Sequence, residues 1–235
     1  MSENGKPKLP LIAVLGGTGK EGSGLAMRWA HAGYPIIIGS RQQDRAKATA
    51  DELNGLLALD TIRGMDNAAA AQAADICILT VVQSAHQEAI LGLKAHLQGK
   101  ILVDATARVD FKDARPPMPP AAARYAQNLL GPGVRVVAAF QNVSANLLKK
   151  NLDQPLNTDV LVCADDLEAA QQVIGLALAA GMRAFYAGDL DNAVVVEGLT
   201  AVLITLNKYY GTRAATINVT GLSGKSSGGF PVKKA

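Results

Sequence analysis

Hydrophobic positions along the first two-thirds of this chain fall into short apolar runs, and the segments between most of these runs have helical spacing. In a typical such segment Leu25, Ala26, Trp29 and Ala30 recur at every third or fourth position before Gly33 ends the pattern. The alternation indicates an α/β fold built on a doubly wound parallel sheet. The apolar runs predict strands at residues 11–15, 36–38, 61–65, 76–82, 100–105 and 134–140.

The last third of the chain repeats this pattern on a smaller scale. Strands are expected at residues 160–164 and 183–187, with an amphipathic helix between them, and a long helix is expected over 191–210. Apolar residues recur along the long helix at helical spacing, so its stripe packs either in the core or at a subunit interface. We therefore expect a larger domain, residues 1–155, and a smaller C-terminal α/β or mostly helical domain, residues 156–235.

A glycine-rich turn, Gly16-Gly-Thr-Gly-Lys-Glu-Gly22, follows directly on the first apolar run. In a dinucleotide-binding βαβ unit, Gly17 makes the tight turn, Gly19 lets the backbone approach a pyrophosphate, and Gly22 lets the helix pack close to the strand. Glycines at this spacing also occur in ordinary turns. Here, however, a strand precedes the turn and a helix and a second strand follow it, so we predict a Rossmann dinucleotide-binding domain.

The end of the second predicted strand indicates which dinucleotide binds. NAD-binding folds usually place Asp or Glu there, about 20 residues past the glycines, whereas this chain reads Gly39-Ser-Arg41. Ser40 and Arg41 offer a hydroxyl and a guanidinium to a 2′-phosphate, and Arg45 lies one helical turn beyond. The alternative is that both arginines are solvated charges at a helix start, where a cation is unfavourable. The sequence therefore favours NADP over NAD.

Composition and charge argue against several other classes of protein. The chain has 235 residues, 49% of them hydrophobic, and its net charge of +3 comes from scattered residues, which argues against a nucleic-acid partner. The apolar segment 194–206 contains Glu197 and is shorter than the ~20 residues that a membrane span needs. No signal-peptide cleavage site follows the first apolar run, so we expect the protein to be cytoplasmic. We also expect an enzyme that acts on a small-molecule substrate and does not bind a membrane.

The cysteines and histidines suggest no further chemistry. Cys77 and Cys163 lie in apolar strand-like runs, where a thiol acts as a small hydrophobe. His31, His86 and His96 have no metal-ligand spacing, so no metal is expected. A lone histidine is more often a surface or capping residue than a catalyst, although His86 follows a strand end where cofactor loops lie. The sequence identifies no catalytic acid, base or nucleophile, and hydride transfer does not require one.

Two connections lie near the expected cofactor edge of the sheet. The proline-rich segment 114–120 must be a loop, either a lid over the cofactor or a plain surface connection. After the sixth strand, Ser144 is expected to be the N-cap of a helix over residues 145–151. The small residues Val143, Ser144 and Ala145 either serve helix entry and packing or leave room for a flat ring.

Four motifs occur in order along nearly the whole chain: Gly16-Gly-Thr-Gly19, Gly39-Ser-Arg41, Ala139-Phe-Gln-Asn-Val-Ser-Ala145 and Val162-Cys-Ala-Asp-Asp166. Together they resemble the NADPH-dependent reductases of the deazaflavin coenzyme F420. The resemblance implies a Rossmann domain, a smaller C-terminal domain and a homodimer. It also implies reversible hydride exchange between NADPH and coenzyme F420 as co-substrate.

The resemblance also implies a set of cofactor-binding residues. They are Thr18, Gly19, Lys20 and Glu21 at the pyrophosphate turn, beside Gly17 and Gly22 of the glycine motif, Ser40, Arg41 and Arg45 at the 2′-phosphate, Gln83 and Val109 after the fourth and fifth strands, and Asn142, Ser144 and Ala145 where nicotinamide meets the substrate.

The chain departs from the resemblance mainly on the substrate side. Gln83 and Gln141 stand where related sequences can carry aromatic or imidazole groups. Two other functions therefore stay open from the sequence. One is an NADPH reductase of another acceptor, such as a flavin, a quinone, a metal chelate or an imine, because fold alone does not choose among them. The other is a non-catalytic NADP-binding sensor.

Overall fold

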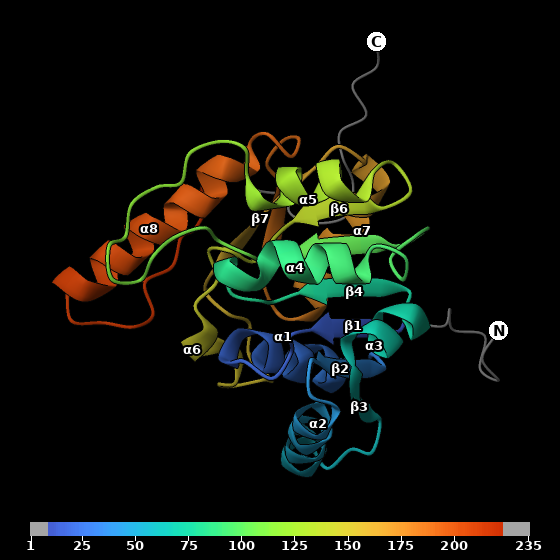
Figure 1. The fold of residues 1–235 in the computed structure, drawn as a ribbon. Coiled ribbons are helices and arrows are strands. Elements are labelled where there is room, and N and C mark those ends of the chain that lie inside the picture. Colours follow the sequence, from blue (N-terminus) through green and yellow to red (C-terminus); the bar gives the residue numbers. More distant parts are fainter. Residues whose placement is uncertain (1–8, 223–235) are drawn as a thin grey trace.

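The computed structural model describes residues 9–222, which form eight strands and eight helices (Figure 1). The strands are β1 (Ile12–Leu15), β2 (Ile36–Ser40), β3 (Ile62–Asp66), β4 (Ile76–Leu79), β5 (Ile101–Asp104), β6 (Arg135–Ala138), β7 (Asp159–Ala164) and β8 (Arg183–Tyr186). The helices are α1 (Lys20–His31), α2 (Gln43–Leu57), α3 (Asn67–Ala73), α4 (Gln83–Leu93), α5 (Ala122–Leu130), α6 (Ala145–Leu148), α7 (Leu167–Ala179) and α8 (Ala193–Tyr209).

All eight strands join one sheet in the order β3-β2-β1-β4-β5-β6-β7-β8. Strands β1 to β6 are parallel, so the predicted doubly wound parallel sheet is confirmed. The chain leaves β1 toward β2 on one side and later returns to place β4 on the other side. In such sheets ligands bind outside the carboxyl ends of the strands at this switch point.

The C-terminal third is α/β, as expected, and it extends this same sheet. Strand β7 runs antiparallel to β6, with Ala138 opposite Cys163, and β8 runs parallel to β7. Helix α8 projects beyond the sheet, and the loop between β5 and α5 passes beside it (Figure 1). The division into two domains near residue 155 remains a prediction.

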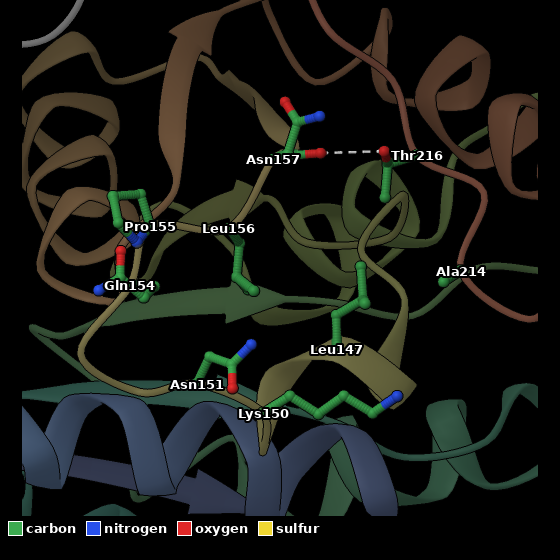
Figure 2. Close-up of a pocket in the computed structure, with 9 residues that line it drawn as sticks. All are labelled: Leu147, Lys150, Asn151, Gln154, Pro155, Leu156, Asn157, Ala214 and Thr216. Atoms are coloured by element: carbon green, nitrogen blue, oxygen red, sulfur yellow. Dashed lines mark hydrogen bonds between the residues drawn. The ribbon is translucent and has the colours of Figure 1, made fainter.

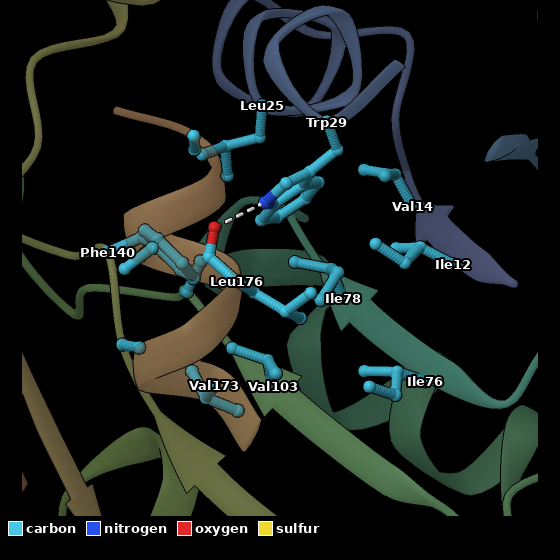
Figure 3. Close-up of a cluster of buried hydrophobic side chains, with 14 of the residues drawn as sticks. Ile12, Val14, Leu25, Trp29, Ile76, Ile78, Val103, Phe140, Val173 and Leu176 are labelled. Carbon is cyan, nitrogen blue, oxygen red and sulfur yellow. Dashed lines mark hydrogen bonds between the residues drawn. The ribbon is translucent and has the colours of Figure 1, made fainter. Parts of the chain in front are cut away.

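Both faces of the sheet are covered by helices, which explains the nearly continuous apolar runs of the strands. In β1, Ile12 and Val14 belong to the core cluster on one face, and Ala13 and Leu15 to that on the other. Figure 3 shows the first cluster, in which the Trp29 ring of α1 meets Phe140 edge-on at 5.7 Å between centroids. The buried indole Nε1 donates to the Leu176 carbonyl at 2.8 Å, so this large side chain joins α1 to α7 without an unpaired polar atom.

A buried arginine also holds α1 in place. The side chain of Arg28 is only 2% exposed, and its guanidinium donates to the carbonyl oxygens of Leu148, Lys150 and Ala180 at 2.8, 2.7 and 3.2 Å. The Leu148 and Ala180 carbonyls lie at the C-terminal ends of α6 and α7, where helices leave carbonyls without intrahelical partners, and the Lys150 carbonyl lies just after α6. Burial lowers the pKa of Arg28, but the three carbonyls supply the acceptors that its charge needs.

The helix after β6 differs from its expected form. The prediction that it extends to residue 151 is wrong, because α6 ends at Leu148 and Asn151 then adopts a positive φ of 46°. Ser144 occupies the N-cap position, but its hydroxyl does not cap the helix and donates instead to the Arg213 carbonyl at 2.9 Å. A partner from a distant part of the chain has therefore replaced the local hydrogen bond.

Candidate functional site

The carboxyl ends of β1, β4, β5 and β6 open into a cleft of about 1090 Å³. Its size is at the upper limit of small-molecule sites, which are about 300–1000 Å³. The turn after β1, the starts of α1 and α4, and the connections after β5 and β6 form one side, and α8 with the segment after it forms the other. The predicted residues that line the cleft are Gly19, Lys20, Glu21, Gly22, Gln83, Val109, Asn142, Ser144 and Ala145.

The glycines of the turn have different structural requirements. A Cβ on Gly17 would lie 2.6 Å from the Val14 carbonyl oxygen, and one on Gly22 would lie 2.7 Å from the Gly17 Cα. The tight turn and the close packing of α1 therefore require these two glycines. A Cβ on Gly19 would meet no atom within 4 Å, so the fold itself does not require this glycine. The open space above Gly19 fits the close approach of a pyrophosphate.

Helix α1 begins at this turn with no side chain capping it. The first backbone N–H groups of a helix have no intrahelical acceptor, and the helix dipole adds positive potential. The turn is held against β2 by a hydrogen bond from the Gly17 N–H to the Gly39 carbonyl at 2.9 Å, and the Gly16 N–H donates to the Asn67 side chain at 3.1 Å. An anion is therefore favoured at the start of α1.

Of the three predicted 2′-phosphate residues, Ser40 ends β2, next to β1 in the sheet, Arg41 follows it directly, and Arg45 lies in the first turn of α2. The Ser40 hydroxyl accepts a hydrogen bond from the Gln42 N–H at 3.2 Å, and the side chains of Arg41 and Arg45 are exposed. The strand order puts them at the same edge of the sheet as the glycine turn. Five predicted residues do not line the cleft: Gly17, Thr18, Ser40, Arg41 and Arg45.

A buried ion pair lies behind the cleft, where β5 ends. Asp104 is fully buried, and its Oδ2 lies 2.6 Å from Nε2 of His86 on α4. Its other oxygen accepts the Thr106 N–H at 3.0 Å, and its backbone carbonyl accepts the Gln141 side chain at 2.9 Å. Burial lowers the pKa of His86, but the hydrogen bond and charge of Asp104 outweigh burial and raise it. The expectation of a surface or capping role for His86 is wrong.

Several residues of the cleft carry buried oxygen atoms without a hydrogen-bond partner in residues 9–222. Buried polar atoms in proteins are nearly always hydrogen-bonded, so such atoms mark positions where a ligand or water binds. Within the cleft these atoms are Glu21 Oε1, Thr106 Oγ1, Gln141 Oε1 and Asn142 Oδ1.

Helix α8 and the segment after it supply a wall of the cleft that sequence reasoning missed. Thr200 donates from its hydroxyl to the Gln141 carbonyl at 2.8 Å, and the Asn207 side chain accepts the Ala215 N–H at 2.9 Å. The polar face formed by Thr200, Asn207 and Lys208 was a usable signal, because these positions share one side of the helix. The cleft residues from this wall are Thr200, Leu203, Ile204, Asn207, Lys208, Thr212, Arg213 and Ala215.

The segment after α8 also lines a smaller hollow of about 290 Å³ (Figure 2). Arg213 and Ala215 line the cleft, whereas Ala214 and Thr216 line the hollow, as expected for an extended backbone. The Thr216 hydroxyl donates to the Asn157 carbonyl at 3.0 Å, which holds the segment against the connection before β7 (Figure 2).

The loop between β5 and α5 is tied to α8 through Glu197. This buried carboxylate accepts the Arg108 side chain at 3.0 Å and the Ala122 N–H, the first of α5, at 2.5 Å. Val109 and Phe111 of the loop line the cleft. The proline-rich residues 114–120 do not line the cleft, although they belong to the same connection.

Comparison with known proteins identifies the family. Residues 11–108 match the family described as NADP oxidoreductase, coenzyme F420-dependent. The F420-dependent NADP reductase of Methanothermobacter marburgensis is 38% identical over 223 residues, which cover 90% of this chain and 98% of that protein. This chain belongs to the F420-dependent NADP reductases. The reductase of the same name from Methanocaldococcus jannaschii is 39% identical, with the same coverage of both chains.

A solved structure shares the fold of this family member. A protein from Arthrobacter sp. FB24, assigned as an F420-dependent NADP reductase, superposes with a TM-score of 0.75 at 25% identity. The superposition covers 89% of this chain and 99% of the other. Within residues 9–222, no helix is both long and apolar enough to cross a membrane, and no three His, Cys, Asp or Glu side chains are grouped to hold a metal ion.

Proposed function

We propose that this protein transfers a hydride reversibly between NADPH and the deazaflavin coenzyme F420. The observation that carries the proposal is the large cleft at the switch point of the sheet, in a chain 38% identical to an F420-dependent NADP reductase. One end of the cleft is the uncapped start of α1, which suits a dinucleotide phosphate. The remaining cleft extends to α8 and leaves space for a second ring system.

Residues at or after the ends of five strands, β1, β2, β4, β5 and β6, would bind the dinucleotide. We assign the pyrophosphate to the turn from Gly17 to Gly22, and the 2′-phosphate to Ser40, Arg41 and Arg45. Arginine suits a phosphate because its planar, permanently charged fork donates two parallel hydrogen bonds. We place the nicotinamide at the other end of the cleft, near Gln83, Val109, Asn142, Ser144 and Ala145.

The chemistry belongs to the two ligands, and the protein orients them. Hydride transfer requires the reacting carbons to lie about 3–3.5 Å apart with their rings aligned. The protein would stack the two rings, exclude water and hold their edges by hydrogen bonds. The unpartnered oxygens of Gln141 and Asn142 are available as acceptors at that end of the cleft. The Asn142 amide nitrogen is already used, because it donates to the Asp159 carbonyl at 2.7 Å.

We also propose that the protein is a homodimer in which α8 contributes buried surface. Val195, Val202, Leu206 and Tyr209 are exposed by 65, 53, 38 and 81% and recur on one face of α8. Phe111, on the loop after β5, is also exposed, by 74%, and lines the cleft. A contiguous exposed apolar surface of this kind is typical of a protein interface. We further propose a cytoplasmic location, which suits the two free, buried cysteines.

A turnover assay tests the proposed reaction. Full-length protein is mixed with NADPH and oxidised coenzyme F420, and the loss of the F420 absorbance is followed. We expect reduction of F420, and no comparable turnover when FMN or a quinone replaces it. Turnover of FMN or a quinone but not of F420 would refute the deazaflavin as substrate. NADPH binding with no turnover of any acceptor would favour a nucleotide sensor.

A further inference from the structure

Glu21 is an unusual residue for its position in the cleft. It lies in the first turn of α1 and lines the cleft, one residue from Lys20 and two from Gly19. An acidic residue in the first helical turn is ordinarily stabilised by the helix dipole. At this turn, however, a carboxylate would repel the phosphates that the same helix start attracts. The protein must therefore either keep Glu21 away from the ligand or keep it uncharged.

The surroundings of Glu21 favour the uncharged form. Its Oε1 is buried and has no hydrogen-bond partner in residues 9–222. Burial, and then the nearby charge of Asp104, raise the pKa of Glu21 from 4.5 to about 8. A carboxyl group with this pKa holds its proton at neutral pH and can donate a hydrogen bond.

The other charges of the region are arranged around Asp104. His86 on α4 pairs with Asp104, and both oxygens of Asp104 already accept hydrogen bonds. Arg108 and Glu197 form a second ion pair, and their charges act on the pKa of His86 in opposite directions: Glu197 raises it and Arg108 lowers it. The charge of Asp104 therefore acts on Glu21, while each oxygen of Asp104 already has a donor of its own.

We propose that Glu21 binds the dinucleotide as a neutral carboxylic acid, donating a hydrogen bond to an oxygen of the ligand, and that burial of its carboxyl group, with a smaller contribution from Asp104, keeps it neutral. The inference rests on the proposed binding of NADP at this turn. It makes dinucleotide binding dependent on one proton. Above about pH 8 Glu21 ionises, a negative charge develops beside the phosphates, and affinity falls.

The test is the dissociation constant of NADP⁺, measured by calorimetry on the full-length protein. We expect the wild-type constant to increase at least about tenfold from about pH 7 to about pH 9.5, because Glu21 loses its proton in this range. Glu21→Gln keeps the shape and a donor but cannot ionise, so its constant should change less than about twofold over the same range. Glu168→Gln is the matched control, because Glu168 is an exposed acidic residue in the first turn of α7 outside the cleft, and it should keep the tenfold change.

Two further variants keep the test decisive if Glu21→Gln does not fold. Asp104→Asn removes the neighbouring charge, so the weakening of binding should begin at lower pH. Glu21→Ala should remove the pH dependence and weaken binding near pH 7, where the wild-type carboxyl group is the donor that this variant lacks. A wild-type constant that does not change with pH, or a Glu21→Gln constant that rises as in the wild type, overturns the inference but not the proposed function. Absence of NADP⁺ binding at every pH overturns both.

Discussion

At the residue scale, the glycines of the turn after β1 separate a requirement of the fold from a requirement of the ligand. Gly17 and Gly22 are required by backbone contacts within the protein, whereas Gly19 faces open space. A substitution at Gly19 can therefore affect binding without affecting folding.

We expect Gly19→Val to weaken NADPH binding by about 100-fold or more, because its side chain fills the space that the pyrophosphate needs. Circular dichroism and thermal melting should remain close to wild type, since a Cβ there meets no atom within 4 Å. Gly22→Val is the contrasting variant and should not fold normally. Retained NADPH affinity in a folded Gly19→Val protein would show that the turn does not bind phosphate.

We expect Arg41→Ala to raise the dissociation constant of NADPH about tenfold, which is about 1.4 kcal/mol, and to leave that of NADH nearly unchanged. Only NADPH carries the 2′-phosphate that the guanidinium would bind. Arg63→Ala is a matched control, because Arg63 is exposed on the adjacent strand but pairs with Ile37, away from its carboxyl end. An equal loss of affinity for NADH and NADPH would contradict the assignment.

Glu21 also affects stability without ligand. Its pKa in the folded protein, about 8, lies above its value of 4.5 when exposed, so the folded state binds the additional proton. Stability therefore falls as the pH rises from about 4.5 to about 8. We expect Glu21→Gln to remove this loss and to stabilise the protein by about 1–3 kcal/mol near pH 8.5, with a much smaller effect near pH 4.5. Urea denaturation of wild type and variant at both pH values measures this change in stability. An equal change at the two pH values would refute the raised pKa of Glu21.

At the scale of elements, Arg28 connects three helices that the sequence pattern did not relate to one another. Its guanidinium joins α1 to the C-terminal ends of α6 and α7 through three carbonyls. Helix α6 in turn begins at the Ser144–Ala145 edge of the cleft. The packing of α1 therefore also positions one wall of the candidate site.

We expect Arg28→Met to destabilise the protein by about 2–4 kcal/mol, because buried carbonyl groups are left without donors. Arg63→Met, at an exposed position, should change stability by less than about 0.5 kcal/mol. Chemical denaturation of both variants provides the comparison. If Arg28→Met loses no more unfolding free energy than Arg63→Met, water must replace the guanidinium as donor to the three carbonyls at no cost in stability.

At the scale of the whole molecule, residues 9–222 leave an apolar face of α8 uncovered. The helix forms a wall of the cleft with its polar face and exposes Val195, Val202 and Tyr209 on another face. Burying such residues is worth about 1.5–3 kcal/mol for each large side chain. A second copy of the chain that covers this face would also steady the wall of the cleft.

We expect sedimentation equilibrium to give twice the chain mass of 24.4 kDa at micromolar concentration. Val202→Asp should shift the protein toward the monomer, because a charge would be buried in the interface. Leu167→Asp, on the exposed part of α7, is the matched control and should leave the mass unchanged. A wild-type mass of 24.4 kDa would contradict the dimer.

The sequence by itself determined the order of strands and helices, the doubly wound sheet and the glycine turn, because these depend on local periodicity and on backbone contacts close in sequence. The family was also recognisable from the ordered motifs around Gly19, Arg41 and Asn142. The predicted strand ends were correct to within a few residues.

Only the tertiary structure decided which distant groups meet. The His86–Asp104 pair, the Arg28 contacts and the wall formed by α8 each join residues from different elements. The hydroxyl of Ser144 likewise binds Arg213, which lies 69 residues away along the chain, instead of capping α6. Local spacing carries no information about such pairs, because burial and the competition between partners are set by how the helices pack on the sheet.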